Sequence, residues 1–229
     1  MAATVNEIQQ AVAAVVDLDQ DTANISTADY ALRIDYMNRR ERKWAEITDW
    51  QVLFTEYATQ TSLNSGNVTV ALPTQWRKPA GYPVITYDGV DTKQFTEIQK
   101  QEEGQYTSTD KYVYYGGDPS GTQVMVVHPG TSSGFLASGA SIYIPYFKSP
   151  ASLSTSTSKI TCPNPDYIIR GVIADVWEAR EDARFEIAKA EANEILRNML
   201  ERENTPSIAA SNRHIKSIDQ TRFSHRWGK

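Results

Sequence analysis

Apolar residues recur at steps of three and four along residues 165–203, which form the longest periodic stretch of the chain. The apolar stripe consists of Ile169, Val172, Ile173, Val176, Ala179, Ala183, Ile187 and Ala190. This period, with Gly171 as the only glycine, predicts a single helix with one apolar face. Asn164 is a suitable N-cap, Pro165 suits a first turn, and Pro206 lies just past the far end. With a rise of ~1.5 Å per residue, the helix would be about 58 Å long and would extend beyond its own globular body.

A second helical pattern begins at the capping-box sequence Ser26-Thr27-Ala28-Asp29 and continues to about Gln60 without glycine or proline. Its large apolar residues keep approximately to one face, and its other face carries a basic cluster. The cluster consists of Arg39, Arg40, Arg42 and Lys43. A solvated face or a subunit interface is the favoured interpretation of this cluster, with nucleic-acid contact as the alternative.

The two long helices are expected to pack antiparallel, because each presents an apolar stripe that needs a partner. We expect their pairing core to contain Trp44, Trp50, Phe54, Ile169, Ile173 and Val176. A weaker amphipathic helix is predicted over residues 3–16, and the acidic stretch that follows it is interpreted as a solvated linker.

From Asn67 the apolar period changes from helical spacing to alternation, which is typical of short strands. The predicted strands are 68–73, 83–87, 94–98, 112–115, 123–127 and 141–147. Asp118-Pro119-Ser120-Gly121 matches a type I turn and predicts a hairpin. Pro145 suggests that the last strand lies at an edge or ends in a bulge. Strands of this number and spacing indicate a small sandwich or barrel.

These elements predict an α+β protein with long antiparallel helices, an inserted small β-sandwich or barrel and an extended C-terminal tail. Residues 1–66 would form the N-terminal helical part, and residues 67–150 the inserted β domain. Residues 151–203 would supply a linker and the long C-terminal helix, which packs on the N-terminal helices. Residues 204–229 would form an extended basic tail.

Charge is distributed unevenly along the chain, whose formal net charge is −5. Residues 204–229 hold five basic residues against Asp219, a balance of +4, so residues 1–203 carry −9. An acidic body disfavours tight duplex DNA binding, since affinity for DNA depends on neutralising phosphates. The tail is suited to contact an acidic surface. With 40% apolar residues a packed core is expected, and neither a membrane span nor a signal peptide is predicted.

Residues able to carry chemistry are sparse and do not form known motifs. The histidines are His128, His214 and His225, and none has the spacing of a metal ligand pair. Gly130-Thr131-Ser132-Ser133-Gly134 lacks the lysine that a phosphate-binding loop needs, and Phe135 stands in its place. The single Cys162 is interpreted as a structural thiol. We therefore expect no catalytic site, no metal and no cofactor.

Several stretches together resemble the adaptor, or head-completion, proteins of tailed bacteriophages, and the resemblance covers nearly the whole chain. They are Asp35-Tyr36-Met37-Asn38-Arg39-Arg40 leading to Trp44, Val70-Ala71-Leu72-Pro73, Tyr143-Ile144-Pro145-Tyr146-Phe147 followed by Lys148-Ser149-Pro150, and Cys162-Pro163-Asn164-Pro165-Asp166-Tyr167. The order of helix, long helix, β insertion, long helix and basic tail agrees with that family.

The resemblance implies a homo-oligomeric ring of twelve subunits in the virion neck, between capsid and tail, assembled after synthesis in the host cytoplasm. The ring would dock on the portal protein by its C-terminal segment, attach tail or nozzle proteins at the far side, and let double-stranded DNA pass through its lumen without sequence-specific binding. The expected portal-binding residues are Arg213, Lys216, Arg222, Phe223, Arg226 and Trp227.

Two other functions remain open at this point. A carbohydrate-binding or tail-tip adhesin module would use tyrosines of the β region to stack on sugar rings, although packing across a sheet explains such tyrosines equally well. A virion-associated hydrolase would need a pocket with convergent titratable groups, which the sequence does not indicate.

Overall fold

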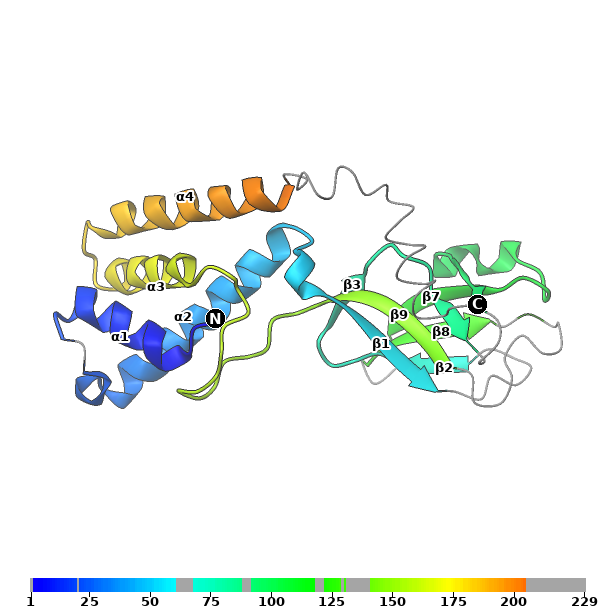
Figure 1. The fold of residues 1–229 in the computed structure, drawn as a ribbon, viewed down its shortest axis with the longest axis horizontal. Helices are drawn as coiled ribbons and strands as arrows, with labels where there is room; N and C mark the ends of the chain where they lie inside the picture. Colours follow the sequence, from blue (N-terminus) through cyan, green and yellow to red (C-terminus); the bar gives the residue numbers. More distant parts are fainter. Residues whose placement is uncertain are drawn as a thin grey trace. The chain divides into compact units, whose positions relative to one another are not determined.

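The structure is a computed structural model that describes residues 2–19, 21–60, 68–87, 92–117, 122–128, 130 and 141–204. The chain divides into two compact units (Figure 1). Among the described residues, the helical unit contains those up to Leu53 and those from Ser149 to Asn204, and the β unit contains those within Phe54–Lys148. Helices and sheets are thus separated along the chain, and the α+β class predicted from the sequence is confirmed.

Four α-helices form the helical unit, and the third of them is its centre. The helices are α1 (Val5–Val16), α2 (Thr27–Ile47), α3 (Pro165–Ala179) and α4 (Phe185–Asn204), with the short 3-10 helices η1 (Thr22–Asn24) and η2 (Gln51–Leu53). α3 packs against each of the other three. Its residues Ile168, Val172 and Ile173 are fully buried, as expected for a helix with neighbours on several sides.

The helix starts follow the capping signals in the sequence. The Ser26 hydroxyl accepts the amide N–H of Asp29 at the start of α2, and the Asn164 side chain accepts that of Asp166 at the start of α3. At α1 the Thr4 side chain accepts the N–H of Glu7, whose carboxylate accepts the N–H of Thr4 in return. Each cap satisfies an amide that the helix itself leaves without a partner.

The prediction of a single long helix over residues 165–203 is wrong, because the chain turns back after Ala179. Glu181 adopts a left-handed conformation (φ 56°) and donates its amide to the Glu178 carbonyl at 3.1 Å. The Asp182 amide reaches the Trp177 carbonyl at 2.9 Å, which completes a Schellman-type helix end. α4 then runs back along α3 (Figure 1). The second half of the predicted apolar stripe is also wrong, since Ala183, Ile187 and Ala190 are exposed and α4 instead buries Ala188, Ala192 and Met199.

The second long helix is also shorter than expected. α2 ends at Ile47, and residues Phe54–Gln60 form strand β1 of the β unit. Phe54 therefore does not belong to a helix-pairing core, and its ring instead meets those of Phe147 and Tyr82 at 6.0 and 5.7 Å between centroids. The spacing of Phe54 and Tyr57 fits a helix by coincidence, whereas the Phe, Thr and Tyr content of this segment favours a strand.

Two sheets make up the β unit. In the first, the order is β1 (Phe54–Gln60), β9 (Ser141–Lys148), β4 (Ile85–Tyr87) and β5 (Thr92–Gln94), and β3 (Trp76–Pro79) also pairs with β9. In the second, the order is β2 (Val68–Ala71), β8 (Gln123–His128), β7 (Tyr112–Gly117) and β6 (Thr96–Glu97), followed in sequence by η3 (Lys100–Gln105). The pairs are antiparallel except for β6 and β7, which are parallel.

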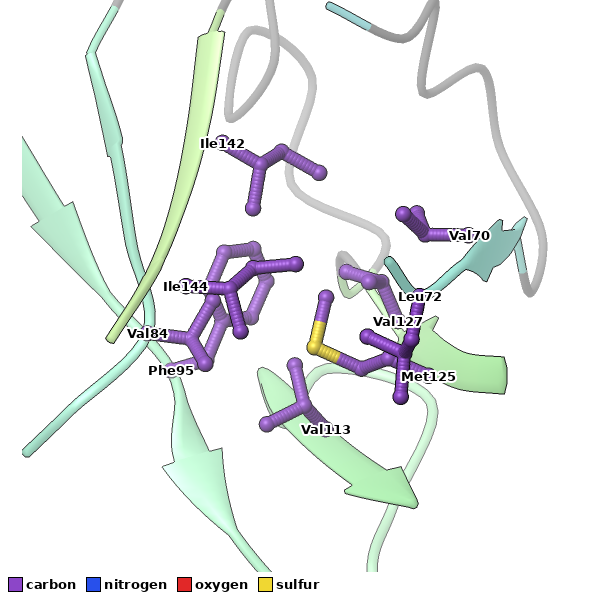
Figure 2. Packing of buried hydrophobic residues seen from close by; sticks show 9 residues of the cluster. All are labelled: Val70, Leu72, Val84, Phe95, Val113, Met125, Val127, Ile142 and Ile144. Atoms are coloured by element: carbon purple, nitrogen blue, oxygen red, sulfur yellow. The ribbon is translucent and has the colours of Figure 1, made fainter. Parts of the chain in front are cut away.

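The β unit is a sandwich rather than a closed barrel, because the described strands form two separate sheets that share one core. Figure 2 shows these side chains pointing toward one another. They are Val70, Leu72, Val113, Met125 and Val127 on one side, and Val84, Phe95, Ile142 and Ile144 on the other. The expected turn at Asp118–Gly121 lies outside the described residues, and the strands on either side of it, β7 and β8, pair antiparallel as predicted.

Pro145 does not mark an edge, since β9 is central in its sheet. β9 pairs with β1 along one side, and on its other side with β4 at residues 141–143 and with β3 at residues 146–148. Pro145 lies where the second partner changes from β4 to β3, and its carbonyl accepts the Ala80 amide at 3.2 Å. A missing N–H is tolerated at this gap between two partner strands.

Candidate assembly surfaces

The tryptophans expected in the helix-pairing core lie inside the helical unit. Trp44 is 0% exposed, and its ring stacks on that of Trp50 with 5.1 Å between centroids. The Trp50 indole donates to the Trp44 carbonyl at 2.7 Å. Ile173 and Val176 are also buried, whereas Ile169 is half-buried. The direct pairing of Trp44 with the α3 stripe stays a prediction.

A buried ion pair joins α2 to α3. The Arg40 guanidinium binds the Asp175 carboxylate through two contacts, Nε to Oδ2 at 2.9 Å and Nη2 to Oδ1 at 2.5 Å. Gly171 makes room for this arginine, because a Cβ at position 171 would come within 2.8 Å of Arg40 Cδ. The one glycine of the predicted helix thus allows Arg40 to lie across α3. Bidentate geometry of this kind holds two elements in a fixed register.

Two further polar residues of α2 hold the segment that returns from the β unit. Asn38 and Leu153 exchange two hydrogen bonds, with Asn38 Nδ2 donating to the Leu153 carbonyl at 3.0 Å and the Leu153 amide donating to Asn38 Oδ1 at 2.8 Å. Glu41 Oε1 accepts the amides of Thr161 and Cys162, both at 2.8 Å. Two of the stretches that carry the family resemblance therefore contact each other. Sequence reasoning did not find these partners.

Glu41 is 1% exposed, and burial raises the pKa of its carboxyl although the two amides partly offset this effect. A carboxyl whose pKa is raised by folding contributes most to stability below its unfolded pKa of about 4.3, and this contribution is lost as the pH rises through the folded value. Ionisation of Glu41 should therefore lower the stability of the wild type as the pH rises toward neutral. A substitution that removes the charge should remove this decline.

We expect Glu41→Gln to stabilise the protein progressively, relative to the wild type, between acid and neutral pH. Urea unfolding over this range measures the difference. Glu7→Gln is the matched control, since hydrogen bonds from Thr4 lower the pKa of Glu7 and give the opposite sign, a contribution lost as the pH falls. Parallel pH profiles for Glu41→Gln and the wild type would contradict the proposed burial effect.

The basic cluster of α2 contains three exposed cations rather than four, because Arg40 points inward to Asp175. Arg39 lies over the Tyr36 ring, 5.4 Å from its centroid, and Arg42 Nε donates to the Asn38 carbonyl at 3.3 Å. Lys43 is exposed beside them. Arg39 and Arg42 are thus held along the helix, and with Lys43 they form a basic outer face.

The expected portal-binding residues lie outside the described residues. They are Arg213, Lys216, Arg222, Phe223, Arg226 and Trp227. The described helix that leads to them is fixed near its end, since the Glu203 carboxylate accepts the Gln51 amide at 2.7 Å. The tail therefore begins from a point held against η2.

The tyrosines of the described β unit are mainly used in packing. Tyr112, Tyr114 and Tyr146 are buried, and burial raises the pKa of each. Tyr112 stacks on His128 with 4.6 Å between centroids, and Tyr146 stacks on Trp76 with 4.9 Å. Rings used in this way are not available as a platform for sugars, so this arrangement does not favour the carbohydrate-binding alternative.

In the described part of the chain, buried titratable side chains gather where α2 meets α3, at Arg40, Glu41, Cys162, Tyr167 and Asp175. The Arg40–Asp175 ion pair and the bonds from backbone amides to Glu41 already engage the charged members of this group. No group of three or more His, Cys, Asp or Glu residues able to hold a metal occurs among the described residues. Burial raises the pKa of the Cys162 thiol to about 12, which makes it a poor nucleophile. His128 Nδ1 lies 2.9 Å from the Asp110 carbonyl, and His214 and His225 lie outside the described residues. None of the described helices is long and apolar enough to cross a membrane.

Comparison with known proteins agrees with the resemblance noted above. A family model described as the SU10 adaptor protein matches residues 3–214. The match includes both units and ends within the basic C-terminal segment. A search of curated proteins found no significant match.

Proposed function

We propose, since this chain belongs to the SU10 adaptor protein family, that it forms a twelve-subunit ring in the virion neck that joins the portal to the tail. The observation that carries the proposal is the family match over residues 3–214. The ring would surround a lumen through which double-stranded DNA passes. A body charge of −9 supports weak contact with that DNA, because like charges repel it.

We assign the portal contact to the C-terminal tail. Its +4 balance and its two aromatic residues, Phe223 and Trp227, suit an acidic partner that offers an apolar pocket. Exposed ion pairs alone contribute only ~0 to 1 kcal/mol each, so the aromatic anchors supply most of the affinity.

The β unit is assigned to contacts with tail proteins or neighbouring subunits. It is a separate compact unit with its own core, so its loops can vary without disturbing the helices. No catalytic role is assigned to it, and no cofactor is needed for the proposed activity.

Deleting Ser217–Lys229 is expected to abolish attachment to portal-bearing heads and to leave the thermal melt of the isolated protein nearly unchanged. The physical reason is that the deletion removes three of the cations and both aromatic anchors and leaves every described core residue in place. Cosedimentation with purified heads measures attachment. Unchanged docking of the truncated protein would overturn the assignment of the portal contact.

A further inference from the structure

One end of the helical unit brings together the ends of α1 and α3. Leu18, just after α1, and Glu181, just after α3, are the two non-glycine residues with positive φ in the described chain, at 58° and 56°. Asp17 joins these two ends through Arg180, whose guanidinium lies 3.2 Å from its carboxylate, and it also binds Arg33 of α2 at 2.5 Å. Figure 1 shows the end of α1 and the turn from α3 to α4 at the same end of the unit.

This end exposes apolar side chains that nothing in the described chain covers. Leu18 is 89% exposed, Ile187 is 64% exposed and Val15 is 36% exposed. Leucine is also unfavourable at a left-handed position, where glycine is usual. The Leu18 side chain is thus exposed, and its residue type is unfavourable for the left-handed backbone conformation. A residue with neither advantage in the isolated unit is typical of a contact with another molecule.

The same end is strongly acidic. Residues 17–21 and 178–187 hold seven acidic residues against two basic ones, a net charge of −5. Both basic residues are already engaged within the unit, Arg180 with Asp17 and Arg184 with Asp182. We define the end surface as Val15, Leu18, Glu178, Glu181, Glu186 and Ile187.

A second surface of the same unit has the complementary character. We define the α2 surface as Leu32, Arg39, Arg42, Lys43 and Ile47. Its two apolar members are 43% and 46% exposed, and its three cations lie within five residues. Asp35 and Glu46 are also exposed on this helix, at either side of the cations. Both surfaces belong to one compact unit.

We propose that the end surface of one subunit docks on the α2 surface of the next copy of this chain, an inference that rests on the ring of the proposed function. The end surface cannot pair with a second end surface, because acid would face acid. The α2 surface offers both the opposite charge and apolar contacts. Two different surfaces on one unit give a head-to-tail contact, and such contacts form a ring when the rotation between neighbouring subunits closes. Opposite charges also make assembly sensitive to salt.

The test uses two charge-reversed full-length variants on purified portal, with native mass measurement of the assembled species. One variant carries Glu178→Lys, Glu181→Lys and Glu186→Lys, and the other carries Arg39→Glu, Arg42→Glu and Lys43→Glu. Neither should form a ring alone, whereas an equimolar mixture should form a ring in which they alternate, because each reversed surface then meets its opposite. Both should keep the wild-type circular dichroism spectrum.

Ring formation by either variant alone at wild-type concentration would overturn the proposed contact and leave the adaptor function standing. Failure of the mixture to form a ring when both variants are folded would also overturn the proposed contact. That outcome would indicate that the portal or a tail protein covers the end surface. Failure of the wild type itself to form a ring on the portal would overturn the proposed function.

Leu18→Gly separates contact from stability. The melting temperature should stay unchanged or rise, because glycine readily adopts a φ of 58° and the lost side chain is exposed. Ring formation should weaken at least about tenfold, since the apolar anchor is lost. Val52→Ser, at an exposed apolar residue of neither surface, should leave both unchanged. A lower melting temperature with unchanged ring formation in Leu18→Gly would overturn the role given to Leu18.

Discussion

Trp44→Ala is expected to lower the free energy of unfolding by about 3 to 5 kcal/mol, since it empties the site of one of the largest fully buried side chains in the helical unit. The loss includes the stacking of Trp44 on Trp50, whose indole donates to the Trp44 carbonyl. Urea unfolding followed by helical circular dichroism measures the change.

Ile47→Ala is the matched control for Trp44→Ala, because Ile47 is an exposed apolar residue of the same helix. It should change stability by less than about 0.5 kcal/mol. A loss below about 1 kcal/mol for Trp44→Ala would show that α2 does not pack in the helical core through this residue.

Asp175→Asn is expected to destabilise the helical unit by about 3 to 5 kcal/mol, because it leaves the Arg40 charge buried without its partner. The double variant Arg40→Met, Asp175→Leu should recover most of this loss, since two apolar side chains of similar size remove the charge that needs compensation. The free energy of unfolding in urea distinguishes the two variants.

An exposed ion pair provides the comparison for Asp175→Asn. Arg170 and Glu191 lie 3.1 Å apart, and their side chains are 43% and 45% exposed. Glu191→Gln should cost less than about 1 kcal/mol. Equal effects of Glu191→Gln and Asp175→Asn would contradict the view that burial makes the Arg40–Asp175 pair important.

The helix starts could be predicted from the sequence, whereas the helix ends could not. Ser26, Asn164 and Pro165 are strong capping residues, and their helices begin where these residues predict. The usual mark of a helix end is a glycine in the left-handed conformation, but here Leu18 and Glu181 occupy those positions. Nothing in residue type therefore indicated that the chain folds back after Ala179.

The polar contacts between α2 and the returning chain were also beyond sequence reasoning. Residues 39–43 read as one run of charges, and residue type alone does not tell which of them point inward. Gly171 and Asp175 carry a signal that could have been used, since a glycine one turn before an acid leaves room for an arginine beside it. The Glu41 contacts are made to backbone amides, which leave no trace in sequence.

The described strands were easier to predict than their arrangement. Alternation of apolar residues located β2, β4, β7, β8 and β9, and the two sheets that share one core match the expected sandwich. β1 was missed because its aromatic residues also fit a helical period. The central place of β9 depends on β3 and β4 sharing one side of it, which is a property of long-range pairing rather than of local sequence.

A cryo-EM map of the virion neck tests the central claim most directly. The account predicts a closed ring of this chain between portal and tail, with the tail residues 213–227 against the portal and the end surface of each subunit on the α2 surface of the next. A neck map in which no density fits the helical and β units, or in which this chain lies elsewhere in the virion, would contradict the account.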